Sequence, residues 1–121
     1  MAFLSKAAIL AAKDKKMVEV TVPEWLDEKG EPGVVNLRVL TGTERDRFES
    51  EFVGGNKSVD MVRAKLVAKC LCDAEGNRLF TEQEIPALGE KSAAVLDRLF
   101  SQCMKLNRFT KEDVEDLAGN S

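Results

Sequence analysis

The sequence contains no histidine in 121 residues, and this absence restricts the chemistry available to the chain. Ser–His and Cys–His nucleophile systems are excluded, so a general base would have to be a carboxylate, a lysine or a cysteine. The carboxylates fall on predicted helix caps and polar faces, where solvated charge explains them. Gly54 and Gly55 lack the spacing and the following lysine of a phosphate-binding loop. We therefore expect no enzymatic activity and no cofactor.

Cysteines are few and odd in number: Cys70, Cys72 and Cys103. A disulfide framework is not expected, because the chain shows no export signal and one cysteine would be left over. Structural zinc needs four ligands, and without histidine only the third cysteine could join the first two. We expect three buried, inert thiols and no metal.

Long apolar runs and basic faces are also missing. The longest apolar stretch near the N-terminus covers residues 7–12, far short of a membrane span, and no basic segment precedes it as in a signal peptide. The 18 basic and 21 acidic residues are interspersed and give a net charge of −3. We therefore expect neither a nucleic-acid partner nor a membrane partner, and we expect the protein to reside in the cytosol.

What is present is an ordinary globular composition, with 44% apolar and 32% charged residues. A chain of this length can bury one adequate core, so residues 1–121 are expected to form a single domain. Residues 1–13 have a helix-favouring composition and predict an N-terminal helix or arm. A helix packed on its own domain is the favoured interpretation, because exposed apolar patches are uncommon, and an arm offered to a partner is the alternative.

Residues 16–40 predict a pair of antiparallel strands. Val18, Val20 and Val22 alternate with polar residues up to Pro23, which is expected to end the first strand. A turn-rich stretch, 27–33, joins it to a second alternating run through residue 39. A two-stranded ribbon needs helices over its apolar face. The chain is thus predicted to be α+β, mainly helical, with a small two-stranded antiparallel hairpin.

Residues 43–118 predict the helices. Thr43 and Asp46 are a candidate cap for a helix through Phe48 and Phe52. A central helix is expected to start at Ser58 or Asp60 and to continue through Leu71, with Lys65 and Lys69 facing water. Further cap signals, each followed by apolar residues, are Thr81 with Glu84, Ser92, and Thr110 with Asp113.

The two later helices differ in regularity. Pro86 should keep the first one short. The helix after Ser92 is the most regular in the chain, and its predicted inner face consists of Leu96, Leu99, Cys103 and Leu106.

A calcium loop is suggested by Asp73, Glu75, Asn77 and Glu84, which occupy positions one, three, five and twelve of that motif. Position six requires a glycine, and here it is Arg78. A plain turn leading into a capped helix explains the same residues without an ion.

Six segments along the whole chain resemble the tail assembly chaperones of long-tailed bacteriophages. They are MAFLSKAAIL, EVTVPEW, VNLRVLTGTERDRFE, RAKLVAKCLCDAEGNRLFTEQEI, ALGEKSAAVLDRLF and LNRFTKEDVEDLA. RVLTGTERD and EKSAAVLDRLF are the most diagnostic. The similarity is a pattern along a domain, so it transfers a role more securely than a site.

The resemblance implies a non-virion protein of the host cytoplasm that binds the tape measure protein and keeps it soluble while tail subunits polymerise. It also implies that a longer, frameshifted product would recruit the major tail protein, this chain being the shorter product. Self-association along the tape measure would fit this role. A structural tail or head–tail component of the virion is the alternative. Candidate contact residues on terminal elements are Phe3, Leu4, Ile9, Leu10, Phe109, Val114 and Leu117.

Overall fold

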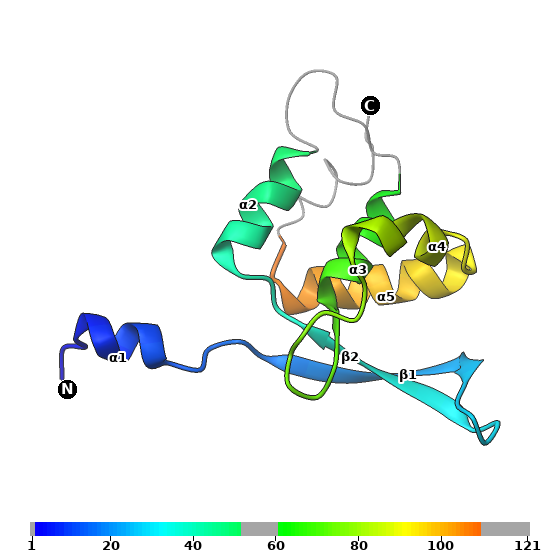
Figure 1. Ribbon diagram of the computed structural model, residues 1–121, viewed down its shortest axis with the longest axis horizontal. Coiled ribbons are helices and arrows are strands. Elements are labelled where there is room, and N and C mark those ends of the chain that lie inside the picture. Colours follow the sequence, from blue (N-terminus) through cyan, green and yellow to red (C-terminus); the bar gives the residue numbers. More distant parts are fainter. Residues whose placement is uncertain (1, 52–60, 110–121) are drawn as a thin grey trace.

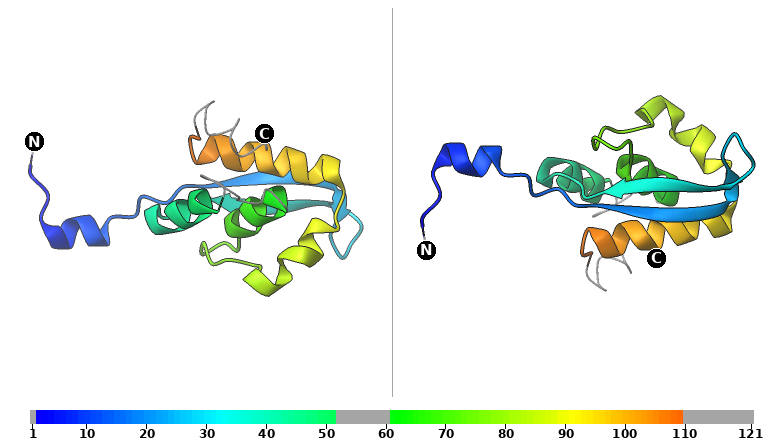
Figure 2. Two further views of the ribbon diagram at one scale, coloured as in Figure 1. Left: turned by 90° about the horizontal axis from the view of Figure 1, so that it is seen from above. Right: turned by 90° about the horizontal axis from the view of Figure 1, so that it is seen from below.

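The computed structural model describes residues 2–51 and 61–109. These residues form five α-helices, one 3-10 turn and a three-stranded antiparallel sheet, which confirms the α+β class. In chain order the elements are α1 (Lys6–Ala11), β1 (Met17–Leu26), β2 (Pro32–Arg38), α2 (Gly42–Ser50), α3 (Val62–Cys70), β3 (Leu71–Cys72), η1 (Glu82–Glu84), α4 (Ile85–Gly89) and α5 (Ala93–Leu106). The helices α3, α4 and α5 lie on one side of a long β1–β2 ribbon (Figures 1 and 2).

The ribbon has the predicted register, with Val18 opposite Leu37 and Val20 opposite Val35, both pairs turned toward the helices. The two-stranded prediction is wrong in one respect, since β3 pairs with β2 and the sheet order is β1-β2-β3. Residue patterns do not predict β3, because this strand is two residues long and follows α3 without a turn. Leu71, predicted as the end of the helix, is its first residue.

Pro23 does not end β1, contrary to the prediction. The strand continues to Leu26 after a register irregularity between Val22 and Leu26. Proline is tolerated there because β1 is the outermost strand of the sheet and the irregularity interrupts the ladder. Beside it, a Cβ on Gly33 would lie 2.2 Å from the Trp25 carbonyl oxygen, so the close approach of the two strands requires glycine.

The cap of α2 lies two residues earlier than predicted. The Thr41 N–H donates to the Glu44 carboxylate at 2.9 Å, and the Glu44 N–H donates to the Thr41 hydroxyl at 3.1 Å. This reciprocal pair is a capping box, so the predicted cap of Thr43 with Asp46 is wrong. Phe48 is fully buried, as its position on the inner face requires. Phe52 lies outside the described residues.

The helix α3 is the central helix, as predicted, because Leu66, Val67 and Ala68 are completely buried between the sheet and the other helices. The expectation that Lys65 and Lys69 face water is wrong for Lys69, whose exposed fraction is 8%. Its Nζ lies 3.3 Å from the Glu82 carboxylate. Lys65 is half-buried. The predicted start at Ser58 or Asp60 falls outside the described residues.

The predicted cap of Thr81 with Glu84 is confirmed, and α4 is as short as Pro86 led us to expect. Leu96, Leu99 and Cys103 on α5 are buried against α3 and the ribbon. Ser92 occupies the N-cap position of α5 but makes no side-chain capping hydrogen bond. The core thus lies between one face of the ribbon and α3, α4 and α5.

The predicted turn at residues 73–77 is present. Asp73 Oδ1 accepts the N–H groups of Glu75 and Asn77, both at 2.9 Å, and Gly76 supplies the left-handed conformation at φ +86°. The Glu84 carboxylate, at position twelve of the calcium-loop pattern, accepts hydrogen bonds from the Thr81 N–H and hydroxyl as part of a helix cap. In residues 2–51 and 61–109, no three metal-ligating side chains gather in one place.

The three cysteines are free and buried, as predicted. Burial raises the pKa of the Cys72 thiol. The contact with Cys70, followed by burial, raises that of Cys103. Within the described part of the chain, no helix has the length and apolar character needed to cross a bilayer.

Candidate functional site

The N-terminal segment forms an arm, defined here as residues 2–13, that extends away from the domain (Figures 1 and 2). Its helix α1 begins where the Ser5 hydroxyl accepts the Ala8 N–H at 3.1 Å. No residue of α1 is buried. The predicted helix is therefore confirmed, but the favoured interpretation that it packs on its own domain is wrong.

The apolar side chains of the arm are exposed to a degree unusual for a folded domain. Phe3 is fully exposed, and the exposed fractions of Leu4, Ile9 and Leu10 are 69%, 58% and 79%. Single exposed apolar residues are normal, whereas several on one short exposed segment are typical of interaction surfaces. These four predicted contact residues thus lie together on the arm.

Phe109 lies elsewhere, in the body of the domain. Its ring meets the ring of buried Phe48 edge to face at a centroid distance of 6.2 Å, and the Arg45 guanidinium lies 4.1 Å from its centre. Phe109 is partly buried and packs against the core. The structure therefore does not join Phe109 to the arm, and the other two predicted contact residues, Val114 and Leu117, lie outside the described residues.

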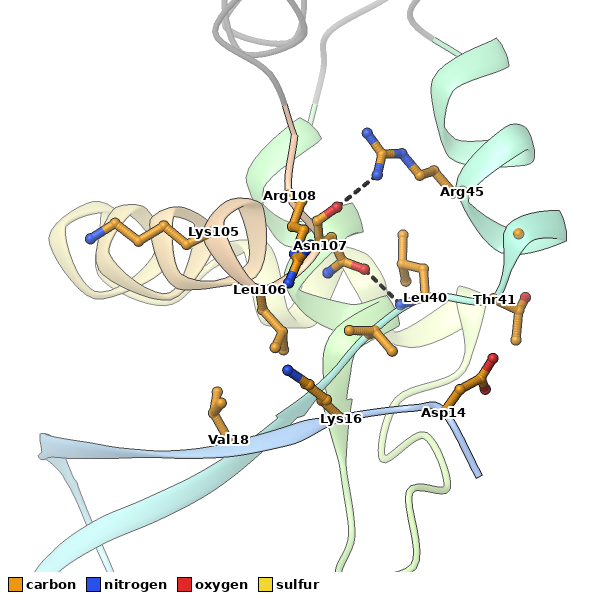
Figure 3. A pocket seen from close by; sticks show the side chains of 12 residues that line it. Asp14, Lys16, Val18, Leu40, Thr41, Arg45, Lys105, Leu106, Asn107 and Arg108 are labelled. Carbon is orange, nitrogen blue, oxygen red and sulfur yellow. Dashed lines mark hydrogen bonds between the residues drawn. The ribbon is translucent and has the colours of Figure 1, made fainter. Parts of the chain in front are cut away.

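A groove of about 600 Å³ opens where the arm joins the domain (Figure 3). We call it the basal groove. It is lined by Asp14, Lys16, Val18, Val39, Leu40, Thr41, Gly42, Arg45, Lys105, Leu106, Asn107 and Arg108. Three stretches far apart in the sequence build it: the start of β1 with its linker, the connection from β2 to α2, and the C-terminal end of α5. The start of β1 is held to the β2–α2 connection by a hydrogen bond from the Val39 N–H to the Lys16 carbonyl at 3.1 Å.

Asn107 fixes the third stretch to the second. Its Oδ1 accepts the Leu40 N–H at 2.7 Å, and its Nδ2 donates to the Cys103 carbonyl at 2.9 Å. The Asn107 carbonyl accepts from Arg45 Nη1 at 2.7 Å, and Figure 3 shows Arg45 reaching across from α2 to make this bond. Asn107 is buried, so these bonds satisfy groups that water cannot reach.

The residue after Asn107 has an unusual backbone. Arg108 adopts a left-handed conformation at φ +54°. The Phe109 N–H donates to the Met104 carbonyl at 3.0 Å, and the Arg108 N–H donates to the Lys105 carbonyl at 3.1 Å. This is a Schellman motif, in which glycine normally occupies the left-handed position. An arginine there costs about 1 kcal/mol.

The basal groove is basic although the chain is acidic. Four cationic side chains and one carboxylate, Asp14, line it. Arg45 is paired with Glu49, at 2.7 Å. Lys16, Lys105 and Arg108 form no ion pair in residues 2–51 and 61–109. Two of these cations, Lys16 and Arg108, are more than 90 positions apart in the sequence, which is why the sequence alone did not indicate the groove.

The fold and these two surfaces define a small α+β domain with an exposed apolar arm and a basic groove at its base. The chain belongs to the phage tail assembly chaperone family, because the family model of that description matches residues 5–120. The predicted resemblance is thereby confirmed.

A solved structure of the bacteriophage HK97 tail assembly chaperone is similar to this chain. The two share 25% sequence identity with a TM-score of 0.56, over 76% of this chain and 85% of the HK97 chain. Comparison with curated protein sequences gives no match.

Proposed function

We propose that this chaperone binds the tape measure protein of the tail and keeps it soluble while tail tube subunits polymerise around it. The observation that carries the proposal is the arm, which holds four exposed apolar side chains in a chain of this family. Exposed apolar helical stripes on a long unassembled partner are complementary to such an arm. The protein acts in the host cell cytoplasm and is absent from the finished virion.

The size of the arm implies weak binding by each copy. Burying an aliphatic or aromatic side chain contributes about 1.5–3 kcal/mol, so the four together contribute roughly 6–12 kcal/mol before costs. Association itself costs roughly 4–15 kcal/mol. A single copy would thus bind weakly, and many copies along one tape measure protein would hold it by avidity. Self-association of the chaperone along its partner fits this arrangement, and a longer frameshifted form would recruit the major tail protein.

Co-expression with the tape measure protein tests the proposal. The variant Phe3→Ser/Leu4→Ser should lose co-purification with the partner and leave the melting temperature of the chaperone unchanged, because neither side chain is buried. A matched control is Val34→Ser/Leu79→Ser, which removes two apolar side chains with exposed fractions of 58% and 52% from the domain body. The control should keep the partner bound. Equal loss in both variants, or no loss in either, would overturn the role of the arm.

Mass spectrometry of purified virions separates this function from the structural alternative. A chaperone is expected to be absent from the particle. Its presence in amounts comparable to a tail subunit would instead establish a tail or head–tail component.

A further inference from the structure

We propose that the basal groove binds an acidic, amphipathic segment of a partner protein. This surface is separate from the exposed apolar side chains of the arm, so the inference goes beyond the proposed function and does not require the partner to be the tape measure protein. The groove has the volume of a site that accepts several side chains, at about 600 Å³.

The groove offers both an apolar and a charged contact. Val18 from β1 and Leu106 from the end of α5 line the groove, and Figure 3 shows these two side chains turned toward the same space. Lys16 reaches from the linker toward Leu106 in the same view. An occupant with apolar residues on one face and carboxylates on the other would meet both sets of side chains.

The charges select an acidic occupant. Lys16, Lys105 and Arg108 lack carboxylate partners in the described part of the chain, and exposed cations on one surface attract anions from solution. The arm of a second copy does not fit this requirement, since its charged side chains are Lys6 and Lys13. Insertion of that arm would place cations against cations.

Nucleic acid is the less suitable anion. A phosphate backbone is held by a row of cations that follows the strand, whereas here the cations surround apolar side chains and Asp14.

Arg108 provides an independent indication. Its left-handed backbone, φ +54°, is one that glycine adopts without cost and that arginine does not. An unfavourable backbone that carries a charged side chain at the edge of a groove is the pattern expected where the side chain serves binding. Glycine at this position should improve folding and weaken the site.

The test is fluorescence anisotropy with labelled peptides and the full chain. The probe is a 14-residue amphipathic helix with leucine on one face and glutamate on the other, and the matched peptide carries lysine in place of glutamate. The acidic peptide should bind at least about ten-fold more tightly at low salt, and its affinity should fall several-fold as NaCl is raised to about 0.3 M. A single-stranded oligonucleotide of similar length should bind more weakly than the acidic peptide.

Two variants locate the site. Lys16→Glu/Arg108→Glu should weaken the acidic peptide about ten-fold or more, whereas Lys29→Glu/Lys91→Glu, the same charge change at two exposed lysines outside the groove, should change it less than two-fold. Arg108→Gly should weaken binding about three-fold while raising the melting temperature, so loss of fold cannot explain the result.

Three outcomes would overturn the proposal: equal binding of the acidic and basic peptides, unchanged binding in the groove variant, or tighter binding of the oligonucleotide. Phe3→Ser/Leu4→Ser should leave peptide binding intact, so a failure of the arm in tape measure capture would be seen separately from a failure of the groove.

Discussion

The side-chain oxygen of Asn107 accepts the buried backbone N–H of Leu40 at 2.7 Å, joining residues 67 positions apart. Asn107→Ala leaves this N–H without a partner, and we expect the free energy of unfolding to fall by about 1–3 kcal/mol. Denaturant unfolding of the variant measures the loss. Asn77→Ala, at an exposed turn, is the control and should cost less. A loss in Asn107→Ala no greater than in this control would show that Leu40 finds another acceptor.

A second prediction concerns the stability of the protein at acid pH. Arg38 donates two hydrogen bonds to the Glu44 carboxylate, at 2.9 and 2.8 Å, and these bonds lower the pKa of Glu44 to about 2. Because the folded-state pKa lies below the ordinary glutamate value of 4.5, the unfolded chain binds the proton more tightly, and stability falls as pH decreases. We expect about 2 kcal/mol, after allowance for partial solvent exposure, to be present above pH 4.5 and lost as pH falls through about 2.

Denaturant unfolding as a function of pH measures this loss, and two variants assign it. Glu44→Gln should remove the share of the pH dependence between 4.5 and 2 that Glu44 contributes, and should be destabilised at pH 7, since the buried Arg38 loses its counter-ion. Glu24→Gln breaks the exposed pair with Arg98, in which the pKa of Glu24 is also about 2. Solvent screens that pair, so the acid midpoint should hardly move. The assignment fails if the two variants behave alike.

A third prediction uses two glycines of different surroundings. A methyl group at Gly33 would lie 2.2 Å from the Trp25 carbonyl oxygen, whereas one at Gly42 would have no atom within 4 Å. Gly33→Ala should therefore destabilise the protein by about 1–3 kcal/mol. Gly42→Ala, in the first turn of α2, should be neutral or stabilise by up to about 1 kcal/mol. Thermal unfolding compares the two, and a tolerated Gly33→Ala would mean that the ribbon can separate there at little cost.

A fourth prediction distinguishes the two phenylalanines that the sequence had grouped as contact residues. Phe109→Ala removes the edge-to-face contact with Phe48 and the stacked Arg45, and should cost about 2 kcal/mol of stability. Phe3→Ala should cost almost nothing, because that ring is fully exposed. Equal melting temperatures of the two variants would contradict the packing of Phe109.

The sequence predicted elements whose signal is local and periodic. The alternation of Val18, Val20 and Val22, the stripe of α5 and the cap of Thr81 with Glu84 all follow from spacing along a single element. Prediction from the sequence failed where the structure of one segment depends on another segment packed against it. Lys69 is buried and paired with Glu82 from another segment, and β3 forms by pairing with β2, so neither outcome follows from the residue's own element.

The candidate surfaces show the same division. The arm could be proposed from its apolar residues, but its extension into solvent is a property of the whole fold. The basal groove was not predicted. A Schellman motif with arginine in the glycine position has no sequence signal, and Lys16 and Arg108 line the same groove only because the fold brings their distant segments together.

The position of β1 at the edge of the sheet has a further consequence, for association with other chains. An open sheet edge is a template on which other chains can add strands and aggregate. Pro23 supplies no N–H, and the register irregularity between Val22 and Leu26 bends the ladder at the same place. A strand from another chain could therefore pair with β1 for only a few residues, which limits aggregation of this domain through that edge.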